Sequence, residues 1–179
     1  MSWTILVPPG GSKEKQLLSS ALEKACSRKV LMFCSSSDQI SETKHYPSGF
    51  RRSRFFLIGA AHDDGSAYGH AGKDNDFIFP GVNVNTSSGA SLSAYLDEKV
   101  LSSKESTGSS IATALAAGLA AMITYSFKTS ELAIVTAKMQ QGKDYIAGPE
   151  LVQPGDVERI AQHSVVKTAF NKIGKIDNG

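Results

Sequence analysis

A run of small apolar residues in the middle of the chain limits the possible folds more than any other feature. Residues 108–123 read GSSIATALAAGLAAMI, and a helix of this sequence is apolar on every side. Such a helix must be covered all round, so we expect it to be buried, and its small side chains let it pass close beneath a sheet. The apolar stretch itself, Ile111–Ile123, is too short to span a bilayer.

Three other apolar runs predict strands. Val30–Cys34 and Phe55–Ala61 show no alternation with polar residues, which is typical of strands buried on both faces of a parallel sheet. Phe77–Phe79, stopped by Pro80 and Gly81, is a shorter third run. Together with the helical segments, these runs predict an α/β layer fold.

Two helices are expected near the ends of the chain, over Ser12–Ser27 and over Asp156–Asn171. The second should bury one face, formed by Val157, Ile160, Ala161, Val165 and Ala169. The serine- and glycine-rich residues 87–107 indicate a loop or irregular hairpin. We find no internal repeat and no convincing linker, so residues 1–179 are expected to form one domain, or part of one.

Composition argues against several classes of function. With 41% hydrophobic residues, 20% charged residues and a net charge of +2, the chain is an ordinary globular sequence without the charge of a nucleic-acid or membrane binder. Cys26 and Cys34 form neither a disulfide framework nor a metal motif, and the aspartates between residues 63 and 76 match no calcium loop. We expect no metal and no cofactor. No signal peptide is visible, which favours an intracellular location.

Two serines stand where the small-residue helix begins, and their residue type leaves two interpretations open. Ser109 or Ser110 could cap the helix by accepting a bond from a free backbone N–H. Alternatively, a serine there is a nucleophile, because the N–H groups at the positive end of the helix dipole can stabilise an oxyanion.

The sequence around these serines resembles the nucleophile motif of the subtilisin-like serine proteases (subtilases, peptidase family S8). That motif is G-T-S-x-A-x-P/A followed by a small-residue buried helix, and residues 108–114 read GSSIATA. The resemblance implies that Ser110 is the nucleophile and that Ser109 takes the usual threonine position. Ala114 stands where the family often has proline.

Other segments are similar to further family blocks in the same order. Residues 77–84 look like the strand and Pro-Gly turn before the nucleophile, and residues 55–61 like the preceding buried strand. Residues 31–38 look like the strand that ends in the oxyanion-hole asparagine. Ser2, Trp3 and Thr4 resemble one wall of the substrate cleft.

The resemblance is clearest over residues 1–123 and is nearest to fungal subtilisin-like domains, which are often parts of longer multidomain chains. It implies a three-layer fold with a mostly parallel central sheet, of which this chain would be the C-terminal, nucleophile-bearing part.

Two departures from the family pattern bear on catalysis. Asp38 stands where the family has the asparagine that donates a hydrogen bond to the oxyanion, and an ionised carboxylate can only accept. The family's catalytic aspartate and histidine precede the Ser2–Trp3 segment, near which this chain begins. The four histidines lie in unpromising contexts, and the local His62–Asp63–Asp64 group is more typical of a surface loop.

The resemblance therefore implies a serine-type endopeptidase domain that acts on peptides or proteins but is inactive as this chain alone. The alternative is a non-catalytic subtilisin-like module that mediates interactions in a larger protein. A third interpretation is that Met1 is a misplaced start and a complete protease domain exists upstream. The expected partners are a peptide substrate and the rest of the domain or further domains.

Overall fold

The protein was analysed as a computed structural model, which describes residues 12–38, 52–69, 74–85, 105–142, 152 and 155–174. The chain divides into two compact units. The first contains residues 1–20 and 32–117, and the second contains residues 21–31 and 118–179.

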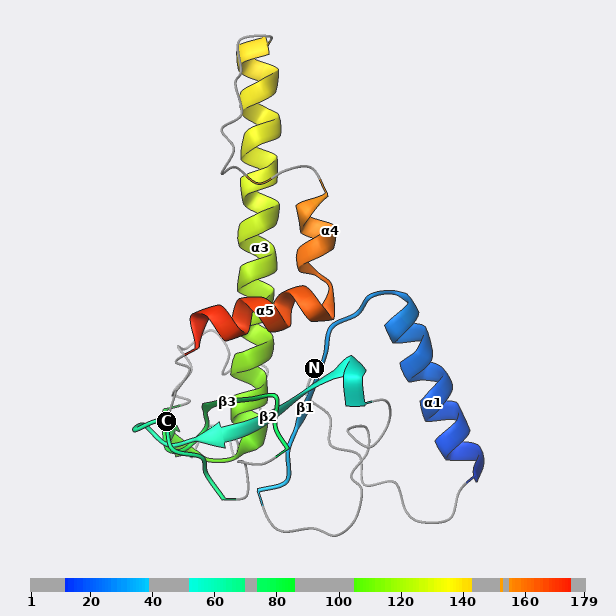
Figure 1. The fold of residues 1–179 in the computed structure, drawn as a ribbon, viewed down its shortest axis with the longest axis vertical. Coiled ribbons are helices and arrows are strands. Elements are labelled where there is room, and N and C mark those ends of the chain that lie inside the picture. The colour runs from blue at the N-terminus through cyan, green and yellow to red at the C-terminus, as the bar shows by residue number, and fades with distance from the viewer. Residues whose placement is uncertain are drawn as a thin grey trace, which may run out of the picture. The chain divides into compact units, whose positions relative to one another are not determined.

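The centre of the first unit is a parallel sheet. Its strands are β1 (Met32–Ser35), β2 (Phe55–Ala61) and β3 (Phe77–Pro80), hydrogen-bonded in the order β1-β2-β3 (Figure 1). Both pairings are parallel, with Met32 opposite Phe55 and Ile58 opposite Phe77. The predicted α/β fold with a parallel sheet is confirmed.

The middle strand carries the core of this sheet. β2 is buried at all of its positions, and it has a hydrogen-bonded strand on each side. Phe56 stacks on Phe33 of β1 at a centroid distance of 4.9 Å and lies 6.3 Å from Phe77 of β3. β3 instead alternates between half-buried and exposed residues, and Ile78 is 40% exposed. β2 is therefore buried on both faces, as its sequence predicts, and β3 is not. Among the described residues β3 is an edge strand.

The small-residue helix is longer than its apolar stretch. α3 runs from Ser109 to Gln141, and Gly142 follows it with φ at 62°. No glycine or proline interrupts the helix after Gly118. The hydroxyls of Thr124 and Thr136 donate to carbonyls one turn back, so these polar residues are accommodated within the helix. α3 is thus longer than the apolar stretch Ile111–Ile123, and by length and composition alone the whole helix could cross a membrane.

Burial of α3 is one-sided. Ala112, Ala116 and Ala120 are at most 2% exposed and follow one another at four-residue spacing, so they form a single buried stripe. Leu115 and Met122 on another side are 43% and 68% exposed. The prediction of a helix covered all round is therefore wrong for the described residues, in which only one face has a cover.

The predicted first helix is confirmed with its bounds, because α1 spans Ser12–Ser27. Two residues after its end, Lys29 has φ at 56°, which lets the N–H of Val30 return to the carbonyl of Ala25 at 3.0 Å. Cys34, which ends the first of the predicted buried strands, is 2% exposed.

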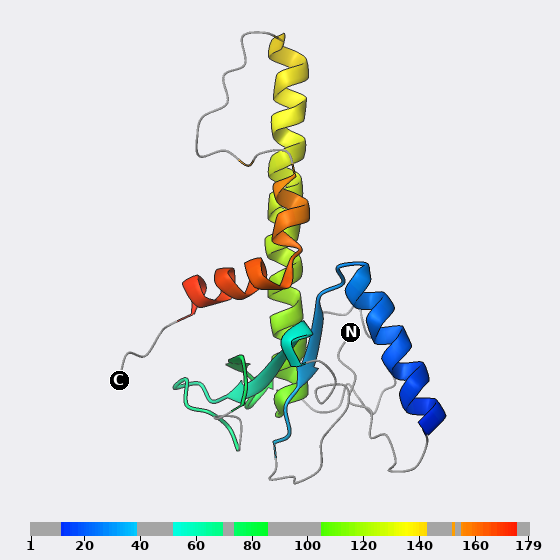
Figure 2. The ribbon, with the colours of Figure 1, turned by 45° about the vertical axis from the view of Figure 1, so that its right-hand side comes forward.

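The predicted last helix is two helices. α4 (Asp156–Ile160) and α5 (His163–Ile173) are separated at residues 161–162 and run in different directions (Figure 2). Because of the break, the buried face of α5 is shifted by about one residue from the face predicted for a continuous helix. Ile160 is buried as expected, but Val166 and Phe170 are the buried residues of α5, in place of the predicted Val165 and Ala169.

Candidate functional site

The carboxyl ends of the three parallel strands meet at one edge of the sheet, which is where open α/β sheets bind their ligands. Ser36 and Asp38 follow β1 at this edge, and Gly81 follows β3. α3 begins here with Ser109, in contact with the segments after β1 and β3. The sequence motifs that lie far apart in the chain are thus brought together around the first turn of one helix.

Ser109 is held from two directions. Its hydroxyl donates to the backbone carbonyl of Ser36 at 2.7 Å, and its own carbonyl accepts from the Thr113 hydroxyl at 2.7 Å. Ser109 is 3% exposed, so its side chain is buried. This hydroxyl does not cap the helix, because it bonds to a residue 73 positions away and not to an N–H of α3.

Asp38 supplies the anion at the start of α3. The Ser109 N–H donates to both carboxylate oxygens of Asp38, at 3.2 and 3.3 Å. Negative charge is favourable there because the unpaired N–H groups give the helix N-terminus a partial positive charge. Asp38 therefore accepts a backbone N–H at the first turn of α3, as a capping carboxylate does. Sequence reasoning did not anticipate its bond to Ser109.

Two glycines allow this close packing. Gly81 accepts a hydrogen bond from the Gly108 N–H at 2.7 Å, which ties the residue before α3 to the end of β3. A β-carbon at Gly81 would lie 2.7 Å from that of Ala60 and 3.1 Å from that of Ala112. Gly108 has φ at 144°, a conformation that other residues rarely adopt, and its position beside Asp38 leaves room for the carboxylate.

A short hairpin leads into the helix. β4 (Val84–Asn85) pairs with β5 (Glu105–Ser106) in antiparallel fashion, and the Asn83 N–H donates to the Thr107 hydroxyl at 2.9 Å. The predicted hairpin over residues 87–107 is thus present at its base, while residues 87–104 lie outside the described residues. Asn83 has φ at 52°, and asparagine's tolerance of that conformation is the signal that could have located this turn.

Ser110 differs from its neighbour in every respect that matters for reactivity. It is exposed, whereas Ser109 is buried. In the described part of the chain its hydroxyl forms no hydrogen bond to a base. Of the two serines, Ser110 is therefore the one that is open to solvent, and Ser109 fixes the helix start beside it.

The remaining sequence-predicted residues do not join this site among the described residues. Ser2, Trp3 and Thr4 lie outside them, as do His45 and His70. The His62 ring packs edge-on against the Tyr68 ring, with 5.5 Å between the two ring centroids. Hydrogen bonds from the Ser66 hydroxyl and N–H hold the pKa of Asp64 below its usual value. The aspartates near these residues form no metal-binding cluster in the described ranges.

Comparison with known proteins gives a likeness of fold alone. No family model matches the sequence, and no curated protein matches it significantly. The chain is similar to the protease domain of PatA, solved as a serine-to-alanine mutant, with a TM-score of 0.50 and 14% identity over 99% of this chain and 60% of that chain. The Prenylagaramide maturation protease PagA gives a TM-score of 0.47 and 15% identity over 79% of this chain and 43% of that one.

The likeness to the PatA protease domain supports the expected fold. The mixed α/β architecture with three parallel strands is consistent with part of a subtilisin-like domain. The chain spans about 60% of the PatA chain and less of PagA, so their activities do not transfer directly to it.

The two serines should respond differently to replacement by alanine. Ser109→Ala removes a buried donor and leaves the Ser36 carbonyl without its partner, so we expect a loss of about 1–3 kcal/mol in the free energy of unfolding. Ser110→Ala changes an exposed side chain and should stay within about 0.5 kcal/mol of the parent. Urea unfolding followed by circular dichroism measures both. Equal losses in the two variants would contradict the assignment of Ser109 as the anchoring residue.

Glycine 81 should be intolerant of a side chain. In Gly81→Ala the added methyl group meets two β-carbons and the Gly108 carbonyl, and we expect destabilisation of about 1–3 kcal/mol from overpacking. Gly118→Ala is the matched control. A β-carbon at Gly118 meets nothing within 4 Å, and alanine is favoured over glycine inside a helix by about 1 kcal/mol. We expect the unfolding midpoint of Gly81→Ala to fall and that of Gly118→Ala to rise. A Gly81→Ala variant as stable as the parent would show that the packing around Gly81 is loose.

Proposed function

We propose that this chain is the nucleophile-bearing part of a serine endopeptidase domain of the subtilisin-like type, with Ser110 as the nucleophile. The observation that carries the proposal is the exposed Ser110 on the first turn of a helix at the carboxyl edge of a parallel sheet. An alkoxide or oxyanion that develops there faces the positive end of the helix dipole. The buried Ser109 supports the proposal because it fixes the orientation of that turn.

In this function Ser110 attacks the carbonyl carbon of the scissile peptide bond. A base removes the hydroxyl proton, and the leaving amine then takes that proton. The described residues place no base against Ser110, and the base in this proposal is a histidine outside the described residues. Ser2, Trp3 and Thr4 are proposed, from the family resemblance, to contact the substrate chain. The fungal-type assignment and the specific peptidase family likewise remain predictions.

A second candidate function has an observation in its favour. The Asp38 carboxylate accepts the Ser109 N–H, and the family resemblance puts a hydrogen-bond donor at this position. An ionised carboxylate there repels the oxyanion. This arrangement favours a non-catalytic subtilisin-like module that keeps the fold to bind peptides or neighbouring domains.

Active-site labelling of the complete gene product, with whatever sequence flanks these residues, separates the two candidates. A fluorophosphonate probe reacts only with an activated serine. The protease function predicts label on Ser110, located by mass spectrometry, which disappears in Ser110→Ala. A complete product that is folded and binds peptides but takes no label would establish the non-catalytic module instead.

A further inference from the structure

The second half of α3 presents an exposed stripe with the spacing of a coiled-coil seam. Its members are separated alternately by three and four residues, and all of them are exposed: Gly118, Met122, Tyr125, Thr129, Leu132, Thr136 and Met139. Met122 and Tyr125 are each 68% exposed, and Leu132 and Met139 are 66% and 80% exposed. Alternating steps of three and four keep a stripe in line with a partner helix over several turns. The stripe lies wholly within the second unit.

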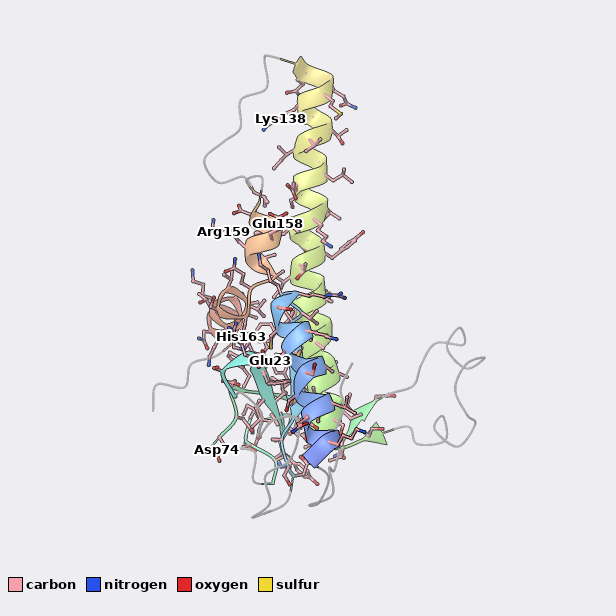
Figure 3. All side chains as sticks on the ribbon, turned by 90° about the vertical axis from the view of Figure 1, so that its right-hand side faces the viewer. Glu23, Asp74, Lys138, Glu158, Arg159 and His163 are labelled. Carbon is pink, nitrogen blue, oxygen red and sulfur yellow. The ribbon has the colours of Figure 1, made fainter. Side chains whose placement is uncertain are left out.

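The stripe is apolar along its length in spite of its threonines. The Thr129 hydroxyl donates to the Tyr125 and Ser126 carbonyls, and the Thr136 hydroxyl donates to the Leu132 carbonyl at 2.9 Å. These hydroxyls are therefore satisfied within the helix and need no solvent. Side chains project from α3 as far as Lys138 near its end (Figure 3). No charged residue lies on the stripe itself.

We propose that this stripe, which runs from Gly118 to Met139 along one side of α3, binds the same stripe of a second copy of the chain in an antiparallel pair of helices. An antiparallel pairing about an axis between residues 130 and 131 gives complementary layers. Met122 then meets Met139 of the other copy, Tyr125 meets Thr136, and Thr129 meets Leu132. Each of the central layers joins one large side chain to one small side chain, which is how a seam fills its space without overpacking.

The exposed area is sufficient for such a dimer. The four large side chains together present on the order of 600 Å² on each copy, given the size of methionine, leucine and tyrosine. Two copies would remove about 1,200 Å² from water, which is the lower end of specific interfaces. An interface of this size is typical of a reversible dimer rather than a permanent one, and we expect its population to depend on concentration.

A bilayer is a poorer occupant of this surface. The uncharged part of α3 includes Ala112 and Ala116, which are buried within the protein, and charged residues begin at Lys128. Ala120 is buried as well, so only residues 121–127 remain free of both buried alanines and charges, and a helix rises about 10 Å over that length. The hydrocarbon core is about 30 Å thick.

Sedimentation velocity of the 179-residue chain at increasing concentration tests the proposal. The chain should pass from monomer to dimer, and Leu132→Glu should weaken the dimer by about a hundredfold or more, because each copy would bury a charge in an apolar layer. Ser130→Glu is the control. It places the same charge on an exposed position of the same helix, outside the stripe, and should leave the dimer unchanged. A monomer at all concentrations, or equal weakening by both variants, would overturn the proposal.

Disulfide cross-linking tests the antiparallel register and does not depend on Leu132→Glu folding. Met122→Cys and Met139→Cys are made in a Cys26→Ser background, and Cys34 is retained because it is buried. Each variant alone should remain uncross-linked, while a mixture of the two should form a disulfide-linked dimer. Cross-linking of either variant with itself would indicate a parallel pair and overturn the proposal. A vesicle-binding experiment tests the membrane as the occupant of the stripe. If the wild-type chain co-sediments with phosphatidylcholine–phosphatidylglycerol vesicles and Leu132→Glu abolishes this binding, the stripe binds a membrane and the dimer proposal is overturned.

Discussion

Replacing Asp38 by asparagine should raise the turnover number about a hundredfold in any form of the protein that carries a base for Ser110. Asparagine keeps an oxygen that can accept the Ser109 N–H, so the start of α3 stays in place. Its amide nitrogen adds a neutral donor where the carboxylate now repels the oxyanion. One oxyanion-hole donor is worth roughly 3 kcal/mol, which corresponds to about a hundredfold or more in rate.

Steady-state peptide hydrolysis by the complete gene product measures this effect, with Asp38→Ala as the matched control. Alanine removes the negative charge but supplies no donor, so its turnover should lie well below that of Asp38→Asn. It also removes the acceptor of the Ser109 N–H, which should lower stability by about 1 kcal/mol, as for the loss of a helix cap. An unchanged or lower rate in a folded Asp38→Asn variant would show that position 38 does not face the oxyanion.

The sequence predicted the elements whose residues alone decide their structure. β2 is continuous, apolar and β-branched or aromatic in part, and it was located to the residue. The bounds of α1 were also correct, because its apolar residues repeat with helical period and its C-terminal residues cannot continue the pattern.

The errors arose where the structure depends on contacts that a local pattern does not contain. An apolar helix indicates that a cover is needed, but not which residues provide it, so the exposed stripe of α3 was missed. The break at residues 161–162 has no glycine or proline to mark it. At the site, the bond from Ser109 to Asp38 joins residues 71 positions apart. The family resemblance aligned both residues, but only the folded chain shows that they contact each other.

The largest expected effect concerns the 179-residue chain by itself, which should not react with a fluorophosphonate at Ser110. Serine is a weak nucleophile at neutral pH because its hydroxyl remains protonated without an adjacent base. Among the described residues no base bonds to Ser110, and His62 instead contacts Tyr68. In subtilisin, removal of the catalytic histidine lowers turnover by about 2 × 10⁶, and binding and the oxyanion hole leave roughly 10³ to 10⁴ over water.

Peptide hydrolysis by this chain should be slower even than that of subtilisin without its histidine, because Asp38 places a negative charge beside the nucleophile. The measurement is the extent of labelling of the purified chain, followed by intact mass, with a fluorophosphonate-reactive protease as a positive control. Ser110→Ala and Ser109→Ala variants establish the background at each serine. Stoichiometric labelling that is lost in Ser110→Ala and retained in a folded Ser109→Ala variant would contradict the prediction. It would mean that a base for Ser110 lies within these 179 residues, and His45 and His70, which lie outside the described residues, would then be the first positions to replace.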